Sequence, residues 1–353
     1  MSNILEKLCG MSYLEKNLFL HLMVENDKTT DFLAILNEAD KEMREKVYRS
    51  LPAPWVDILK SKYTETTVSK AVIHPAEKEI HLLFKEAGKT AEEISKYEAE
   101  HKNLIREARN LMKAGAHADF PCTSDQSRGI EVPPLQKEYD SNAALIDLLP
   151  PDTTILKKPH ILDCIKDRKS RRKFTDEHLT LKELSYLLWV TQGVRKVTPN
   201  GKMSYRTVPS GGARQPFETY VAVQRITGIP PGMYRYLPFG HELVHLFADE
   251  KMSEKLTDLA YGQKFVGNSA VVFIWSVIPY RSEWRYELEA KKDILQESGH
   301  ICQNLYLACE SISCGTCAIG AYDQEGVDHY LGLDGEDEFV IYLAPVGKVK
   351  VDE

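Results

Sequence analysis

The segment from Asp167 to Phe174 concentrates five cationic side chains in eight residues, DRKSRRKF. Within it, Arg168, Ser170 and Arg172 occupy alternate positions, so they can converge on one small anion if the segment is a turn that leaves a helix. Arginine presents a planar fork of charge-assisted donors that matches phosphate oxygens, and a serine hydroxyl adds a short third hydrogen bond. The segment therefore predicts a phosphate-binding turn, with a solvated basic surface as the alternative.

A second candidate segment runs from Arg206 to Phe217 with the sequence RTVPSGGARQPF. It places Gly211 and Gly212 between two prolines, ahead of an expected strand. Glycines without a Cβ allow the backbone to approach a flat ligand closely. The segment lacks the Gly-Lys-Ser/Thr ending of a phosphate loop and is not a dinucleotide fingerprint. A tight loop before a strand is the alternative interpretation.

The third candidate is CGTCAIGAYD, from Cys314 to Asp323. A CxxC pair is typical of dithiol or zinc chemistry. However, the chain has no second CxxC and no histidine at finger-like spacing, and the pair follows an expected helix instead of opening one. The small residues around Gly320 indicate backbone N–H groups offered to a bound group, and no metal site is predicted. A thiol protein that uses Cys314 and Cys317 stays as an alternative.

Composition narrows the function classes. A net charge of −7 over 353 residues argues against a nucleic-acid binder and makes the local basic segment more conspicuous. No apolar run is long enough for a transmembrane helix, and the first residues lack the pattern of a signal peptide. The seven cysteines are an odd number spread along the chain and do not resemble a disulfide framework. We therefore expect a cytoplasmic protein without membrane insertion.

The first part of the chain reads as helix and carries no chemical constellation. Residues 13–24 are strongly apolar, and Gly88 is expected to end a helix over residues 80–84. Thr90 to Glu93 has the form of a capping box that opens the next helix. After it, an apolar stripe follows at helical spacing, made of Ile94, Tyr97, His101, Leu104, Ile105, Ala108 and Leu111.

From Phe120 to His160 repeated prolines interrupt the pattern and favour an extended connector. After Ile161 helices and strands alternate, which favours a mixed α and β layered domain. The predicted domains are thus a helical domain over 1–119, a Pro-rich connector over 120–160 and a mixed domain over 161–353. Its expected elements are a capped helix from Thr180 to Gly193, strands over 217–223, 233–237, 242–246, 270–277 and 339–346, and a helix over 300–310.

Taken in order, these motifs resemble the FMN-dependent nitroreductase superfamily. The resemblance covers about residues 133–351 and includes GHICQNLYLA from Gly299 and the closing PVGK from Pro345. LLWVTQGV from Leu187 and GMYRY from Gly232 are most similar to the SagB-type branch. The resemblance implies an α+β three-layer fold with a central, mostly antiparallel sheet flanked by helices. It also implies an intertwined homodimer with FMN at the subunit interface.

The resemblance also implies roles for individual residues. Arg168, Ser170 and Arg172 match positions that hold the FMN phosphate, with Lys348 as a further cation. Pro209, Ser210, Gly211 and Gln215 match the loop that the neighbouring subunit lays against the ring. The backbone N–H groups of Gly320 and Ala321 match those that face flavin N5. Ala213 departs from the asparagine of many relatives, and Arg214 beside it can reach a carboxylate or phosphate of a substrate.

The expected activity is ping-pong hydride transfer through flavin N5, from NAD(P)H to a small organic substrate, with no side chain as nucleophile. Two alternatives stay open. One is a SagB-type dehydrogenase that oxidises a peptide-derived or other substrate with oxygen as acceptor. The other is a non-catalytic protein that binds or senses flavin. Besides Arg214, candidate substrate contacts come from an expected lid between strands, namely Tyr261, Lys264, Phe265, Trp284 and Tyr286.

Overall fold

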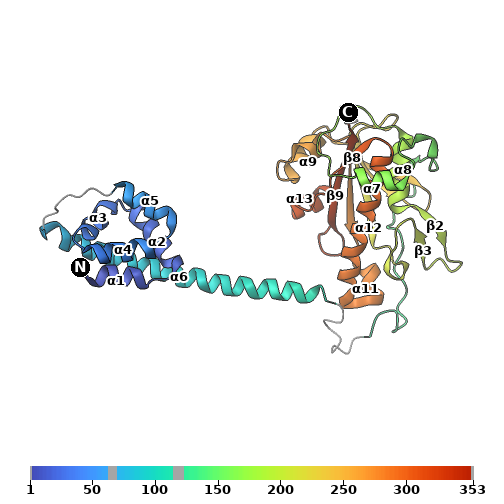
Figure 1. The fold of residues 1–353 in the computed structure, drawn as a ribbon. Coiled ribbons are helices and arrows are strands. Elements are labelled where there is room, and N and C mark those ends of the chain that lie inside the picture. The colour runs from blue at the N-terminus through green and yellow to red at the C-terminus, as the bar shows by residue number, and fades with distance from the viewer. Residues whose placement is uncertain (1, 63–69, 114–122, 351–353) are drawn as a thin grey trace. The chain divides into compact units, whose positions relative to one another are not determined.

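The computed structural model describes residues 2–62, 70–113 and 123–350. The chain divides into two compact units, Met1–Met112 and Lys113–Glu353 (Figure 1). The predicted boundary between residues 119 and 120 lies outside the described residues. None of the described helices combines the length and apolarity needed to cross a bilayer.

The described part of the first unit is helical, as predicted, and its core forms around Phe19. The Phe19 ring packs against the rings of Phe32, at 5.7 Å between centroids, and Phe84, at 4.4 Å. The elements are α1 (Ser2–Gly10), α2 (Tyr13–Glu25), α3 (Thr29–Asn37), α4 (Lys41–Ser50), α5 (Ala53–Lys62) and α6 (Lys70–Leu111).

The helix break predicted at Gly88 is wrong, and so is the capping box predicted at Thr90, because both residues lie inside α6. Ala87 and Ala91 stand one helical turn apart on the same face and are buried. A glycine inside a helix costs only about 1 kcal/mol relative to alanine. Burial of the neighbouring alanines against the core offsets that cost, so the helix continues.

The apolar stripe predicted after Thr90 is helical, but its larger side chains are exposed. Tyr97 and Leu104 keep 67% and 63% of their accessible surface, respectively, and Ile105 keeps 40%. The side chain of Leu111 lies outside the described part. Helical spacing therefore identified the helix correctly without identifying a buried face.

The second unit is built on a seven-stranded antiparallel sheet with the order β1-β6-β5-β4-β7-β9-β8. The predicted strands are confirmed to within two residues, and those over 233–237 and 242–246 form a hairpin, β5 and β6. The sheet consists of β1 (Leu145–Asp147), β4 (Phe217–Val223), β5 (Gly232–Leu237), β6 (Glu242–Phe247), β7 (Val271–Val277), β8 (Cys314–Thr316) and β9 (Phe339–Lys348). A separate hairpin joins β2 (Val194–Val197) to β3 (Ser204–Arg206).

Helices cover both faces of this sheet, which confirms the predicted three-layer fold. The central strand β7 shows it, since Phe273 and Trp275 enter one core cluster while Ile274 enters the other. In Figure 1, α8 (Leu181–Gln192) and α12 (Ala290–Ser311) lie on one side of the sheet. On the other side lie α9 (Met252–Leu259) and α13 (Gln324–Leu331). Shorter helices are α7 (Ile161–Asp167), α10 (Lys264–Gly267) and α11 (Tyr280–Tyr286), with 3-10 turns η1 (Thr153–Ile155), η2 (Gly211–Ala213) and η3 (Glu287–Glu289).

The described part of the predicted Pro-rich connector, residues 123–160, packs on the second unit. Its strand β1 pairs with β6 and so extends the sheet at one edge. The carbonyl of Leu135 accepts a hydrogen bond from Arg206 at 2.9 Å, and the N–H of Lys137 donates to Glu218 at 2.8 Å. These contacts make the segment part of the sheet unit.

Candidate functional site

The basic turn begins where α7 ends, and two of its arginines, Arg168 and Arg172, pair with no acid in the described part of the chain. The Arg168 guanidinium lies 5.3 Å from the centre of the Tyr306 ring, and that of Arg172 lies 6.0 Å from the Phe265 ring. Among the described residues, no carboxylate forms an ion pair with either guanidinium. Ser170 lies between them, with its hydroxyl 3.0 Å from that of Tyr306. These groups are placed to receive an anion.

Arg171, which lies between Arg168 and Arg172, does have an acidic partner. Arg171 binds Glu310 through two guanidinium nitrogens, at 2.8 and 3.2 Å, and its backbone N–H donates to Thr316. This bidentate ion pair fastens the turn to α12 and β8. Lys173 is exposed. A cavity of about 670 Å³ lies along the turn, lined by residues 169–176 and by Val349 and Lys350.

Tyr306 on α12 connects the turn to the third candidate segment. Its hydroxyl contacts Ser170 and also accepts a hydrogen bond from the backbone N–H of Ala318 at 2.8 Å. Tyr306 lies in the family-like segment GHICQNLYLA, but the sequence alone predicted no role for this residue. A single sequence places Tyr306 on a helix, but it does not show that the residue contacts Ser170 or Ala318.

The loop after β8 leaves two backbone donors available. Ile319 pairs with Leu343 on β9, which anchors the start of the loop. In the described structure, the backbone N–H groups of Gly320 and Ala321 meet no acceptor. A Cβ added to Gly320 would meet nothing within 4 Å, so the approach to these N–H groups is open. The carbonyl of Ala321 accepts a hydrogen bond from Gln263, just before α10, at 3.1 Å.

The Pro-Ser-Gly-Gly loop is held in an unusual conformation. Gly212, Ala213 and Gln215 all have positive φ angles, of 53°, 52° and 52° respectively. For the two non-glycine residues this left-handed conformation costs roughly 1–2 kcal/mol each. The Ser210 hydroxyl accepts a hydrogen bond from the Gln215 N–H at 2.9 Å, and the Gln215 amide donates to the Ser204 carbonyl at 3.2 Å. These bonds maintain the strained loop and turn the Gln215 side chain inward.

Glu297 on α12 also contacts the Pro-Ser-Gly-Gly loop. Its carboxylate accepts a hydrogen bond from the Gly211 N–H at 2.7 Å. Burial raises the pKa of Glu297 to about 7, although the hydrogen bonds from Gly211 and Ser210 work in the opposite direction. Sequence reasoning missed this residue because nothing in the sequence shows that it lies under a loop 86 residues away.

The structure divides the predicted site residues into two groups. In the first, Arg168 and Ser170 contact Tyr306, and the Arg172 guanidinium lies over the Phe265 ring of α10. Gln263, just before α10, binds the carbonyl of Ala321 beside Gly320. Lys264 starts α10, and Tyr261 is exposed before it. Pro209 to Gln215 gather near Glu297, with Trp284 and Tyr286 on α11. Glu297 and Tyr306 lie nine residues apart on α12, about 13 Å at the helical rise.

Lys348 has a protein partner. Its ammonium group pairs with the Glu183 carboxylate, which also completes the predicted capping box with Thr180 at the start of α8. Burial opposes the charge, but the Cys314 thiol and the Glu183 carboxylate raise the pKa of Lys348. Lys348 therefore neutralises Glu183, and its role as a further cation for the phosphate stays a prediction.

The two cysteines of the CxxC pair are buried. Burial raises the pKa of the Cys314 thiol to about 12, even with the Lys348 ammonium nearby. A thiol with so high a pKa is protonated at neutral pH and is a poor nucleophile. No group of three metal-ligating side chains occurs among the residues that the structure describes. The geometry thus gives no support to dithiol or metal chemistry.

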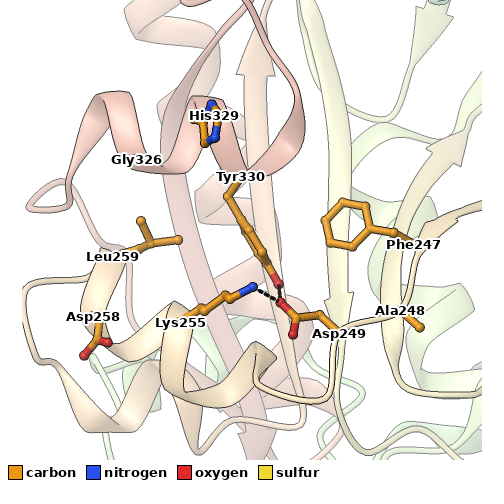
Figure 2. Close-up of a pocket in the computed structure, with 9 residues that line it drawn as sticks. All are labelled: Phe247, Ala248, Asp249, Lys255, Asp258, Leu259, Gly326, His329 and Tyr330. Carbon is orange, nitrogen blue, oxygen red and sulfur yellow. Dashed lines mark hydrogen bonds and ion pairs between the residues drawn. The ribbon is translucent and has the colours of Figure 1, made fainter.

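A larger cavity of about 760 Å³ lies elsewhere, between α9, α13 and the end of β6 (Figure 2). Lys255 and the Tyr330 hydroxyl both bind Asp249 there, at 2.7 and 2.9 Å, and these bonds lower the pKa of Asp249. None of the predicted site residues lines this cavity. The Asp249 carboxylate of this cavity thus already has its partners within the protein.

Similarity to a known family lies within the second unit. The model of the Nitroreductase family matches residues 165–348. The chain is 32% identical over 186 residues to a Methanocaldococcus jannaschii protein named as nitroreductase MJ1384, covering 53% of this chain and 89% of that one. It is 26% identical over 200 residues to the trifolitoxin operon protein TfxC of Rhizobium leguminosarum bv. trifolii, covering 53% and 55%. A solved Ralstonia eutropha structure described as a nitroreductase is 26% identical, covers 63% of this chain and all of that one, and has a TM-score of 0.49.

Proposed function

The chain belongs to the nitroreductase family of oxidoreductases, and on that premise we propose that it is a cytoplasmic, FMN-dependent enzyme. FMN, when bound, supplies hydride transfer at its N5 atom, here in ping-pong order from NAD(P)H to a small organic substrate. We place the cofactor on residues 161–353, with 123–160 packed beside them. The described part of residues 1–119 is helical, and this proposal leaves its role open.

One observation carries the proposal. Arg168 and Arg172 lack acidic partners among the described residues, while Arg171 between them is ion-paired to Glu310. A solvated basic surface would give no reason for this alternation. A phosphate monoester carries nearly two negative charges and offers several acceptor oxygens, which two guanidinium groups and a serine hydroxyl match.

The backbone beyond β8 fits the other end of the cofactor. The N–H groups of Gly320 and Ala321 have no acceptor among the described residues, and the approach to Gly320 is open. Fixed donors of this kind stabilise negative charge on a bound ring without reorganising. Their role is electrostatic, so no side chain needs to act as a nucleophile.

We propose a homodimer in which the loop from Pro209 to Gln215 faces the cofactor of the other subunit. The resemblance to the family assigns this loop to the neighbouring subunit's cofactor. In one chain the loop and the phosphate-binding turn contact α12 at Glu297 and Tyr306, roughly 13 Å apart. Substrate contacts would come from Arg214, Trp284 and Tyr286 beside the loop, and from Tyr261, Lys264 and Phe265 around α10.

The direction of hydride transfer has a second candidate. It is a SagB-type dehydrogenase that oxidises a peptide-derived or other substrate with oxygen as acceptor, in line with the SagB-like segments from Leu187 and Gly232. The 26% identity to TfxC, a trifolitoxin operon protein, is compatible with this candidate. A flavin-binding protein without catalysis would instead bind FMN and show neither activity.

The test is reconstitution with FMN, desalting and a visible spectrum, followed by steady-state oxidation of NADH and NADPH with a quinone or a nitroaromatic acceptor. We expect oxidised-flavin absorbance and turnover with at least one donor. A protein that remains colourless contradicts the proposal. A yellow protein inactive with both donors supports the dehydrogenase or the flavin-binding alternative instead.

A further inference from the structure

Three hydrogen-bond donors surround Gly212 in the strained loop. The Arg214 guanidinium donates through Nε to the Gly212 carbonyl at 3.2 Å. A Cβ placed on Gly212 would lie 3.2 Å from Nη1 of Arg285 and 2.6 Å from the Tyr286 hydroxyl. A side chain here would displace the Tyr286 hydroxyl or the Arg285 guanidinium and would be strained at a φ of 53°. Glycine therefore lets two guanidinium groups and a phenol meet at this position.

These donors retain unused hydrogen-bonding capacity. Arg214 is only 2% exposed, and its buried Nη1 has no hydrogen-bond partner, although Nη2 donates to the Lys202 carbonyl at 2.8 Å. Arg285 is exposed, and the described residues place no carboxylate in ion-pair contact with it or with Arg214. Burial lowers the pKa of Arg214, and the charge of Arg285 lowers it further. A buried donor without an acceptor is costly, which favours a ligand that supplies one.

The surrounding residues fix these cations without neutralising them. The Trp284 ring lies 5.2 Å from the Arg214 guanidinium, and its indole N–H donates to the Ile130 carbonyl at 3.0 Å, which sets the plane of the ring. Two acids of α12, Asp293 and Glu297, approach the loop at Gly211 instead. A planar guanidinium held on an aromatic ring is well suited to bind a carboxylate or phosphate.

We propose that Arg285, Arg214 and Tyr286 form an anion subsite that selects substrates bearing a carboxylate or a phosphate. The inference rests on the proposed function, because the loop from Pro209 to Gln215 would bring this subsite to the edge of the bound ring. The substrate class is then a small planar organic anion, or a nicotinamide donor held by its phosphates.

The first experiment measures binding without turnover. Benzoate, its neutral isostere benzamide and inorganic phosphate are titrated into the full-length protein by calorimetry, in the wild type and in R285Q. We expect wild-type protein to bind benzoate or phosphate more tightly than benzamide. The substitution R285Q should weaken binding of the anion about tenfold. Whether benzoate or phosphate binds more tightly distinguishes the two sources of the anionic group.

A matched control is R128Q, which removes an exposed arginine beside α11 that is ion-paired to Asp125 and does not approach Gly212. It changes the net charge equally and should leave anion binding unchanged. Y286F removes only the phenolic hydroxyl, and we expect a smaller loss of affinity. Equal binding of benzoate and benzamide overturns the subsite, as does equal weakening by R285Q and R128Q.

A kinetic experiment connects the subsite to the reaction. The ratio of KM for 4-nitrobenzamide to KM for 4-nitrobenzoate should fall about tenfold in R285Q, and NADPH should be affected more than NADH if the donor's phosphate uses the subsite. An unchanged ratio for both pairs excludes a role in substrate selection. A colourless protein would refute the flavin proposal alone, because the calorimetric result does not depend on the cofactor.

Discussion

Adjacent residues in the basic turn have different partners, and this difference predicts their effects on cofactor binding. R172A should weaken FMN retention by about tenfold to a hundredfold, the worth of a charge-assisted hydrogen bond at roughly 1.5–3 kcal/mol. K173A removes the same charge from an exposed neighbour and should have little effect. The measurement is the FMN dissociation constant by fluorescence titration. Equal losses in the two variants would mean that the turn is only a basic surface.

A second residue-scale prediction concerns Glu297, whose pKa burial raises to about 7. A carboxyl whose pKa is higher in the folded than in the unfolded protein destabilises the fold as pH rises between the two values. Here that window runs from about pH 4.5 to about pH 7, and the whole effect is about 3 kcal/mol. Below the window the carboxyl is neutral in both states and contributes no penalty.

E297Q removes this titration. Relative to wild type, the variant should gain about 2–3 kcal/mol in unfolding free energy of the second unit between pH 5 and pH 8. The measurement is the calorimetric transition of that unit at the two pH values. E254Q is the control, since it removes an exposed carboxylate of α9. A pH dependence that E297Q leaves unchanged would show that Glu297 does not titrate in this range.

Sequence reasoning at this scale identified residues whose chemistry depends on near neighbours in the chain. Arg168, Ser170 and Arg172 share one short segment, so their spacing was informative. Tyr306 and Glu297 were missed because their partners, Ser170 and Gly211, lie 136 and 86 residues away. Their roles follow from the packing of α12 against two separate loops, which no local pattern contains.

At the scale of elements, Gly88 provides a direct test of why α6 is continuous. The nearest atom to an added Cβ is a Glu15 carboxylate oxygen at 3.9 Å, so alanine fits without strain. G88A should stabilise the first unit by about 0.5–1 kcal/mol, because alanine loses less backbone freedom in a helix. G332A should instead destabilise the second unit, because Gly332 ends α13 with a φ of 70°, which strains any residue with a Cβ.

The two substitutions should therefore shift their transitions in opposite directions. Calorimetry of the full chain measures both, with G88A raising the midpoint of the helical unit and G332A lowering that of the sheet unit. A destabilising G88A would indicate that α6 bends or ends near this residue. Such a result would restore the helix break that the sequence predicts.

Capping patterns show how far local sequence determines an element. Thr180 and Glu183 form the predicted capping box, and α8 begins directly after Thr180. Thr90 and Glu93 present the same pattern inside α6. The difference arises from tertiary packing, since Ala87 and Ala91 are buried on either side of Gly88 and Thr90. Apolar runs such as β7 were predictable because both faces of the strand are buried. Every residue of such a strand is then apolar or small, and the run can be recognised in the sequence.

At the scale of the molecule, the segment 123–160 shows what single-sequence reasoning does not reach. Glu218 lies in the buried strand β4, where a carboxylate would be costly without partners. Arg281 binds it at 2.7 Å and the Lys137 N–H at 2.8 Å, from 63 and 81 residues away. The Pro-rich composition predicted an extended segment, but its packing depends on these distant charged and polar partners.

The proposed dimer gives the last prediction, which tests whether one site combines two chains. R172A damages the phosphate-binding turn, and G212V damages the loop, where a Cβ would lie 2.6 Å from the Tyr286 hydroxyl. Each homodimer then contains two damaged sites. If each site takes its turn from one chain and its loop from the other, a heterodimer of the two variants has one fully intact site and one doubly damaged site. If each site lies within one chain, both sites of the heterodimer are damaged.

Heterodimers isolated through two different affinity tags should therefore bind about one FMN per dimer, although neither homodimer retains it. The bound flavin is counted by absorbance after desalting, with tagged wild-type dimers as the control for two sites. Flavin-free heterodimers would place the whole site within a single chain. The turn near Tyr306 and the loop near Glu297 would then have to reach one cofactor across the roughly 13 Å that separates them along α12.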